Sequence, residues 1–88
     1  MKIKEEYKIE TIGNDKVLLS NTAHNLNYTK VMVLNPTAAF LLEESGHNSF
    51  TNEGWANMLV ERYAIDRELA LADANTLIEK LQQEGVLE

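Results

Sequence analysis

The histidines and serines of this chain are the first side chains to consider for chemistry. His24 and His47 are the only histidines, no cysteine is present, and no His-x-x-x-His spacing occurs. A metal site would therefore need carboxylates from distant segments of the chain. The serines lack the glycine-flanked sharp turn that exposes a nucleophilic serine (Ser20, Ser45 and Ser49). We expect two solvated histidines, no metal site and no nucleophile.

Carboxylates and glycines complete the search for a catalytic site. Glu43 and Glu44 are adjacent, and neighbouring positions on a helix point about 100° apart, so the two carboxylates would not converge on one substrate atom. The four glycines are isolated from one another, which excludes a glycine-rich phosphate loop (Gly13, Gly46, Gly54 and Gly85). We therefore expect a protein that is not an enzyme and binds no cofactor.

Length, charge and hydropathy limit the partners. The chain has 88 residues and a formal net charge of −6. Such a length predicts one domain, spanning residues 1–88, and the negative charge disfavours nucleic acid and anionic lipid. No apolar stretch is long enough for a membrane span, and the N-terminus lacks the apolar core of a signal peptide. We expect a cytoplasmic protein, and a cationic or neutral peptide or protein is the favoured partner.

The first part of the chain has the pattern of an antiparallel sheet. Residues 7–12 alternate between the two faces of a strand, and 13–15 have turn chemistry. Residues 16–20 then form the second strand of a hairpin, 21–27 a polar loop, and 28–34 a third strand. None of these connections is long enough for a parallel crossover, so the pattern favours a meander.

The second part of the chain changes to helical periodicity. Asn35 is placed to cap a helix that begins at Pro36 and stops near Gly46. Thr51 caps a second helix that continues to about residue 63. Asp66 caps a third, longer helix that ends at Gly85. Strands followed by helices indicate an α+β domain.

Residues 31–34 are four adjacent apolar residues, and they predict a strand that is apolar on both faces. A domain this small has little protein to cover both faces, which leaves an opening for a partner. Met32 and Leu34 project on one face and Val31 and Val33 on the other. One pair must serve the core, and the other can line a groove together with residues of the third helix. Two other readings remain open: an interior strand buried on both faces, and an edge that pairs with its twin in a homodimer.

Several segments resemble the PqqD family of small peptide-recognition domains. They are Leu34-Asn35-x-Thr37-Ala38-Ala39-Phe40, the helix ending Leu59-x-x-x-Tyr63, the segment 66–73, and Leu77-x-x-x-Leu81-x-x-x-Gly85-Val86-Leu87. The resemblance implies a winged-helix-like fold, a three-stranded antiparallel sheet followed by three helices. It also implies a non-catalytic adaptor that binds the leader segment of a ribosomally made precursor peptide and presents it to a modifying enzyme, often a radical enzyme.

The resemblance places the leader on the edge of the third strand, in a groove between residues 28–34 and 66–85. Asp73 matches an acidic position of the family and is a candidate to bind a basic leader residue. The candidate peptide-binding residues follow from these elements (Lys30, Val31, Met32, Val33, Leu34, Asp73, Leu77, Ile78 and Leu81).

Two alternatives come from other functional classes. A winged-helix regulator would bind DNA through a basic helix, but the second helix has only Arg62 against two glutamates, and the third helix is also mainly acidic. The remaining alternative is a small homodimerising docking module.

Overall fold

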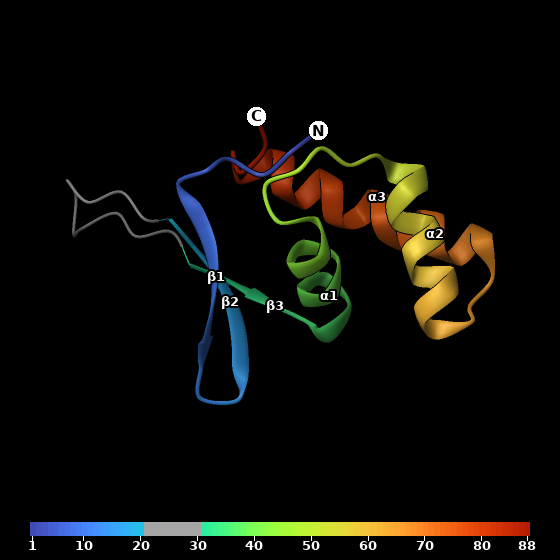
Figure 1. Cartoon of the computed structure of the whole chain (residues 1–88), viewed down its shortest axis with the longest axis horizontal. Helices are drawn as coiled ribbons and strands as arrows, with labels where there is room; N and C mark the ends of the chain where they lie inside the picture. Colours follow the sequence, from blue (N-terminus) through green and yellow to red (C-terminus); the bar gives the residue numbers. More distant parts are fainter. Residues whose placement is uncertain (21–30) are drawn as a thin grey trace.

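The computed structural model describes residues 1–20 and 31–88, and it contains a sheet and three helices (Figure 1). The elements in chain order are β1 (Tyr7–Ile12), β2 (Asp15–Ser20), β3 (Val31–Leu34), α1 (Pro36–Ser45), α2 (Asn52–Tyr63) and α3 (Arg67–Gln83). The expected α+β architecture of strands followed by helices is confirmed. The third strand was expected from residue 28, and positions 28–30, with the candidate Lys30, lie outside the described residues.

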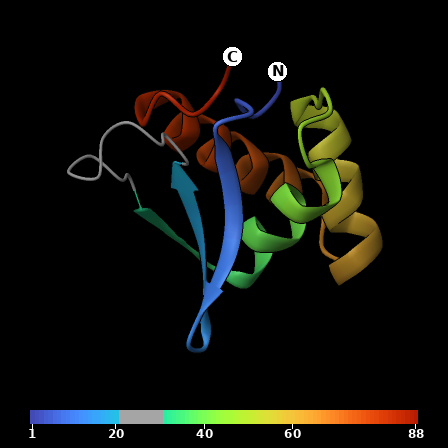
Figure 2. The ribbon, with the colours of Figure 1, turned by 60° about the vertical axis from the view of Figure 1, so that its left-hand side comes forward.

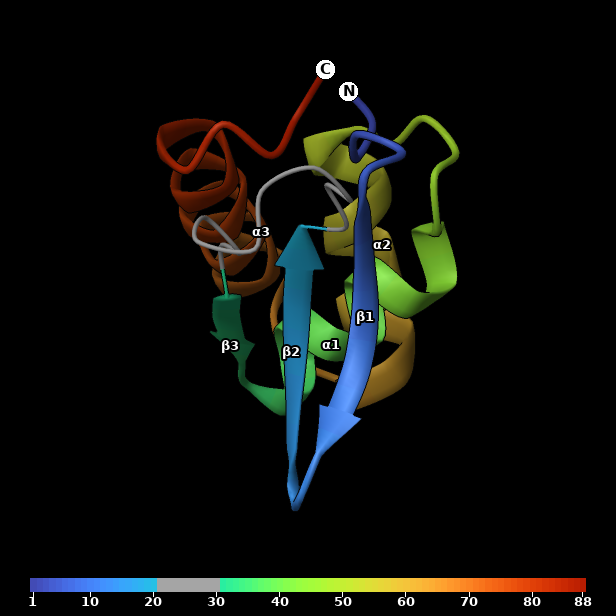
Figure 3. The ribbon, with the colours of Figure 1, turned by 90° about the vertical axis from the view of Figure 1, so that its left-hand side faces the viewer.

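The sheet is an antiparallel meander in the order β1-β2-β3. Gly13 makes the β1–β2 turn with a φ of 63°, a left-handed conformation that glycine adopts without a Cβ clash. In the β2–β3 pairing, Leu18 lies opposite Met32 and Lys16 opposite Leu34. Figures 2 and 3 show the helices gathered behind one face of the sheet, with β1 and β3 at its two edges.

The helices begin largely where their capping residues predict. The Asn35 side chain accepts a hydrogen bond from the Ala38 N–H (2.7 Å), and the Thr51 hydroxyl accepts one from the Gly54 N–H (2.9 Å). Asp66 occupies the capping position of α3 but makes no side-chain capping bond, so its predicted cap is wrong in this respect.

α3 ends in a glycine-dependent turn. Gly85 adopts a φ of 71°, which lets the Val86 N–H donate to the Leu81 carbonyl (3.0 Å). Val86 is thereby buried, and Leu87 forms an isolated antiparallel bridge with Ile3 near the other end of the chain. The expectation that the C-terminal residues fold back onto the core holds.

The core lies between the sheet and the helices, and Trp55 is the largest of its fully buried side chains. The Trp55 ring stacks on Phe50 with centroids 4.0 Å apart, and its Nε1–H donates to the Ser45 hydroxyl (2.8 Å). Leu59 and Leu81 are fully buried in the same core cluster. This arrangement fixes α1 and α3 relative to the sheet, and so determines what faces β3.

Candidate functional site

β3 is an edge strand of the described sheet, with one covered face and one open face. Leu34 is buried and Met32 half-buried, and both pack toward the helices. Val31 and Val33 are 55% and 62% exposed. Within residues 1–20 and 31–88, no strand pairs with the outer edge of β3, so its outward N–H and C=O groups are available. An interior strand buried on both faces is therefore excluded for this part of the chain.

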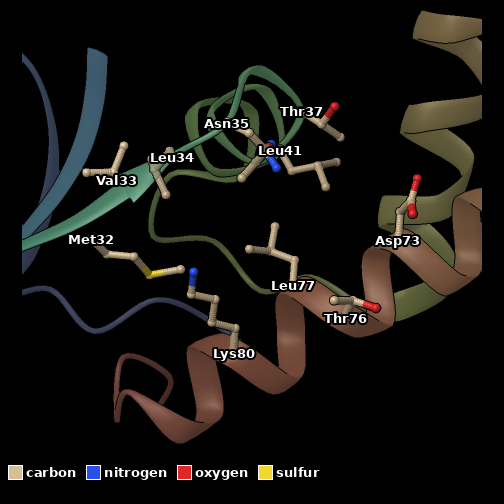
Figure 4. A pocket seen from close by; sticks show the side chains of 11 residues that line it. Met32, Val33, Leu34, Asn35, Thr37, Leu41, Asp73, Thr76, Leu77 and Lys80 are labelled. Carbon is tan, nitrogen blue, oxygen red and sulfur yellow. The ribbon is translucent and has the colours of Figure 1, made fainter.

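A hollow of about 350 Å³ lies between β3, the start of α1 and one side of α3 (Figure 4). Its lining is mainly apolar near the strand and polar toward the α3 rim. The lining residues are Met32, Val33, Leu34, Asn35, Thr37, Ala38, Leu41, Asp73, Thr76, Leu77 and Lys80. A strand added to β3 would lie beside this hollow, and every second side chain would point toward it.

One stripe of α3 supplies the helical side of the hollow. Asp73, Thr76, Leu77 and Lys80 stand three, four and seven positions apart, which places them on one helical face. Leu77 is half-buried between the two charged residues, and Figure 4 shows its side chain pointing into the hollow.

Ile78 and Leu81 belong to the neighbouring stripe of α3 and do not line the hollow. Their side chains are 4% and 0% exposed and form part of the core. Moving from Leu77 to Ile78 turns the side chain by about 100° around the helix, which is enough to take it from the hollow into the interior. The structure thus separates the expected groove residues of α3 into Asp73 and Leu77 at the hollow and the other two in the core.

α1 contributes residues that the sequence did not indicate as a site. Ala38 and Leu41 are buried at the base of the hollow, and Thr37 is half-buried at its margin. Thr76 and Lys80 were also missed, although their spacing from Asp73 was a usable signal. The Asn35 side chain is already engaged in capping α1.

Charge is concentrated at two points of the rim. Asp73 and Lys80 are both exposed, and neither side chain forms an ion pair within the described residues. A larger hollow of about 560 Å³ lies over α1 and the end of α2, and three of its charged residues already have partners. There Lys16 pairs with Glu43, and the Arg62 guanidinium lies 5.5 Å from the centre of the Phe40 ring.

The groups considered for catalysis do not assemble into a site in the described part of the chain. His47 is exposed, and its Nδ1 lies 3.2 Å from the Ile3 carbonyl oxygen. His24 lies outside the described residues. The described ranges contain no group of three histidine, aspartate or glutamate side chains able to hold a metal ion. Among the same residues, no helix combines the length and apolar character needed to cross a bilayer.

One comparison with known proteins identifies a family, and another identifies a shared fold. The family model for coenzyme PQQ synthesis protein D (PqqD) matches residues 15–87. A solved structure of lasso peptide synthetase B1 complexed with the leader peptide is similar to this chain, with a TM-score of 0.71 and 22% sequence identity. The similarity covers 99% of this chain and 95% of that one, so the two share a fold. No curated protein matches the chain in sequence. The match of the family model over most of its length shows that this chain belongs to the PqqD family.

Proposed function

We propose that this protein is a non-catalytic adaptor that binds the leader segment of a ribosomally made precursor peptide. The leader adds to the outer edge of β3 and is presented there to a peptide-modifying enzyme. The single observation that carries the proposal is the edge of β3, which no other strand of residues 1–20 and 31–88 covers, beside a hollow with apolar residues along the strand. Membership of the PqqD family and the shared fold with a protein solved with a leader peptide support it.

Strand addition explains how such a site gains affinity. The backbone groups of β3 can pair with any extended peptide, whereas the hollow selects among side chains. Each apolar side chain buried there contributes about 1.5–3 kcal/mol before ordering costs are subtracted. A few such anchors are enough for a micromolar Kd, which corresponds to about −8 kcal/mol.

The partner enzyme and compartment follow from the same proposal. The enzyme modifies the bound precursor, and the resemblance to the PqqD family makes a radical enzyme one candidate class. A cytoplasmic location suits a chain without cysteine, since no disulfide or thiolate chemistry ties it to an oxidising compartment.

A homodimer through β3 would use the same edge and would therefore compete with the peptide. Val31 and Val33 would then be covered by a second copy. Sedimentation at several protein concentrations, with and without peptide, separates the two arrangements. If the adaptor is correct, any dimer dissociates as the peptide binds.

NMR titration tests the adaptor function. Isotope-labelled protein is mixed with the short precursor peptide encoded near its gene, and amide shifts are followed to saturation. We expect shifts in β3 and along the Asp73–Lys80 side of α3, with little change in β1. An unchanged spectrum at saturating peptide would contradict the proposal, and shifts confined to α2 would relocate the site.

A matched pair of variants on α3 tests the hollow itself. Leu77→Asp places a carboxylate in the hollow, and we expect precursor affinity to fall about 100-fold because an apolar anchor is lost and a charge is desolvated. Leu69→Asp makes the same change on the same helix at a 53% exposed position outside the lining, and affinity should stay within about twofold. Circular dichroism confirms that both variants are folded. Equal losses would refute the assignment of the hollow.

A further inference from the structure

Charge divides the helical rim of the hollow into two ends. Figure 4 shows the Lys80 side chain directed toward Met32, while Asp73 lies at the other end of the stretch, beyond Leu77 and Thr76. The two charged residues are seven positions apart, so they are separated by about 10 Å along the helix axis. Leu77 lies between them, which gives the rim the order acidic, apolar, basic when α3 is followed from its N-terminus.

The same order can be related to β3. The Lys80 end adjoins Met32, near the beginning of β3, and the Asp73 end lies toward the start of α1, into which β3 leads (Figure 4). The described sheet is entirely antiparallel, and antiparallel pairing is the more stable mode per residue. A peptide added antiparallel to β3 runs from the Leu34 end toward the Val31 end. Its N-terminal part therefore lies nearer Asp73 and its C-terminal part nearer Lys80.

We propose that the bound segment has a basic residue, an apolar residue and an acidic residue, in this order and at alternate positions. Residues that share a face of a strand are two apart, and positions i and i+4 are about 13 Å apart. This distance exceeds the separation of about 10 Å between Asp73 and Lys80 along α3, and the flexible side chains of a peptide lysine and glutamate can span the difference. The motif is basic-x-apolar-x-acidic, with the apolar side chain against Leu77. This inference rests on the proposed adaptor function and specifies the peptide that the site selects.

Two features of the rim support selection by charge order. Neither Asp73 nor Lys80 has an ion-pair partner within the described residues, so both remain available to a peptide. Both side chains are exposed, so each ion pair with the peptide is individually weak. A clear difference in affinity therefore requires that the charges at both ends of the peptide be exchanged together. Replacing two attractions with two repulsions is expected to change the Kd about tenfold.

Two heptapeptides of identical composition test the charge order. One is acetyl-Thr-Lys-Val-Leu-Val-Glu-Thr-amide, and the other exchanges only the Lys and Glu. NMR titration up to millimolar peptide measures each Kd. We expect the first isomer to bind about tenfold more tightly at low salt, and the difference to shrink at about 1 M salt because the charges are screened. Equal affinities would overturn the inference, and a preference for the second isomer would overturn the antiparallel order.

The variant Asp73→Lys/Lys80→Asp provides the reciprocal test. It exchanges two exposed charges without changing the net charge, and it should reverse the preference between the isomers. An unchanged preference would show that other residues read the charge order and would overturn the assignment. If neither heptapeptide shifts β3 or α3 while the full precursor does, the motif is wrong and the adaptor function stands. If the precursor also fails, the adaptor function fails with it.

Discussion

The two edges of the sheet differ in how they are protected. β1 carries Lys8 and Glu10, which form an ion pair (3.0 Å) along the edge, and the chain termini meet just before it through the Ile3–Leu87 bridge. β3 carries Val31 and Val33, both more than half exposed, and it contains no charged residue. Each edge adjoins a hollow, of about 240 Å³ at β1 and about 350 Å³ at β3.

This difference indicates which edge accepts a strand. Charged side chains, lysine especially, are a common means of preventing unwanted pairing at a sheet edge, and β1 has them. An exposed apolar edge is a liability unless it is used. β3 lies beside the hollow whose rim carries Asp73 and Lys80, which form no ion pair with any residue that the structure describes. The comparison thus favours β3 as the binding edge and β1 as the protected one.

The strongest test of the comparison alters the backbone of the bound peptide. Two series of leader peptides are compared. In the first, N-methylation removes the backbone N–H groups that face β3, and in the second it removes those that face away. We expect about 100-fold weaker binding in the first series, because several hydrogen bonds are lost and their partners remain unpaired, and no more than about twofold in the second. Calorimetric titration measures both. Equal effects in the two series would argue against strand addition.

The Ser45–Trp55 hydrogen bond of the core should affect stability more than peptide binding, because neither residue lines the hollow at β3. Ser45 is the last residue of α1, and its hydroxyl accepts a hydrogen bond from the Trp55 Nε1–H. Ser45→Ala leaves this buried donor unpaired and should lower the free energy of unfolding by about 1–3 kcal/mol, measured by urea denaturation. The control Ser49→Ala, at an exposed position, should change it by less than about 0.5 kcal/mol. A large loss of peptide affinity in folded Ser45→Ala would show that this hydrogen bond also sets the geometry of the hollow at β3.

Tyr7 gives the β1 edge a pH dependence that β3 lacks. Burial, with smaller contributions from Glu6 and Glu84, raises the pKa of Tyr7 above its ordinary value of 10.0. Above pH 10, the native protein keeps a proton that the unfolded chain has lost, so stability falls as the pH rises toward the raised pKa. The variant Tyr7→Phe should lack this contribution to the loss of stability at alkaline pH, as measured by urea unfolding at several pH values. Tyr63→Phe, at a 42% exposed position, should retain it, and identical pH profiles for all three proteins would contradict the assignment.

The smallest effect is expected from removing the charges of β1. The Lys8–Glu10 pair is exposed, so Lys8→Val/Glu10→Val should change the free energy of unfolding by less than about 1 kcal/mol. The variant should nevertheless self-associate more than the parent protein, because its edge is now apolar. Sedimentation velocity at several concentrations measures this. If it stays as monomeric as the parent, the ion pair does not protect the edge.

Much of the fold was predictable because its signals are local. Turn chemistry at Gly13, capping by Asn35 and Thr51, and the left-handed Gly85 act within a few residues of chain, and the structure agrees with each. The alternation of Met32 and Leu34 against Val31 and Val33 was predictable for the same reason. Asp66 was the exception, since residue type alone does not ensure that a side chain turns back to its own helix.

The site was only partly predictable because it joins elements far apart in the chain. Asp73 and Leu77 were expected at the groove and lie there, but Ile78 and Leu81 are in the core. Periodicity predicts which residues form the apolar stripe of a helix. It does not predict how the helix is rotated about its own axis against the sheet, and this rotation decides which residues at the side of the stripe line the hollow. The spacing of Thr76 and Lys80 from Asp73 places them on its helical face, but exposed polar residues there also fit a solvated surface, so spacing alone did not assign them to the site.

The sequence by itself determined the order of strands and helices, the two-sided apolar character of β3 and the absence of cysteine chemistry, because these depend on residue type and near-neighbour geometry. Only the tertiary structure decided that β3 is an edge, which of its faces is covered, and that Asp73 and Lys80 stand at opposite ends of one hollow. The physical reason is that these relations are set by the packing of α1 and α3 against the sheet around Trp55, which the spacing of residues along one chain segment does not specify.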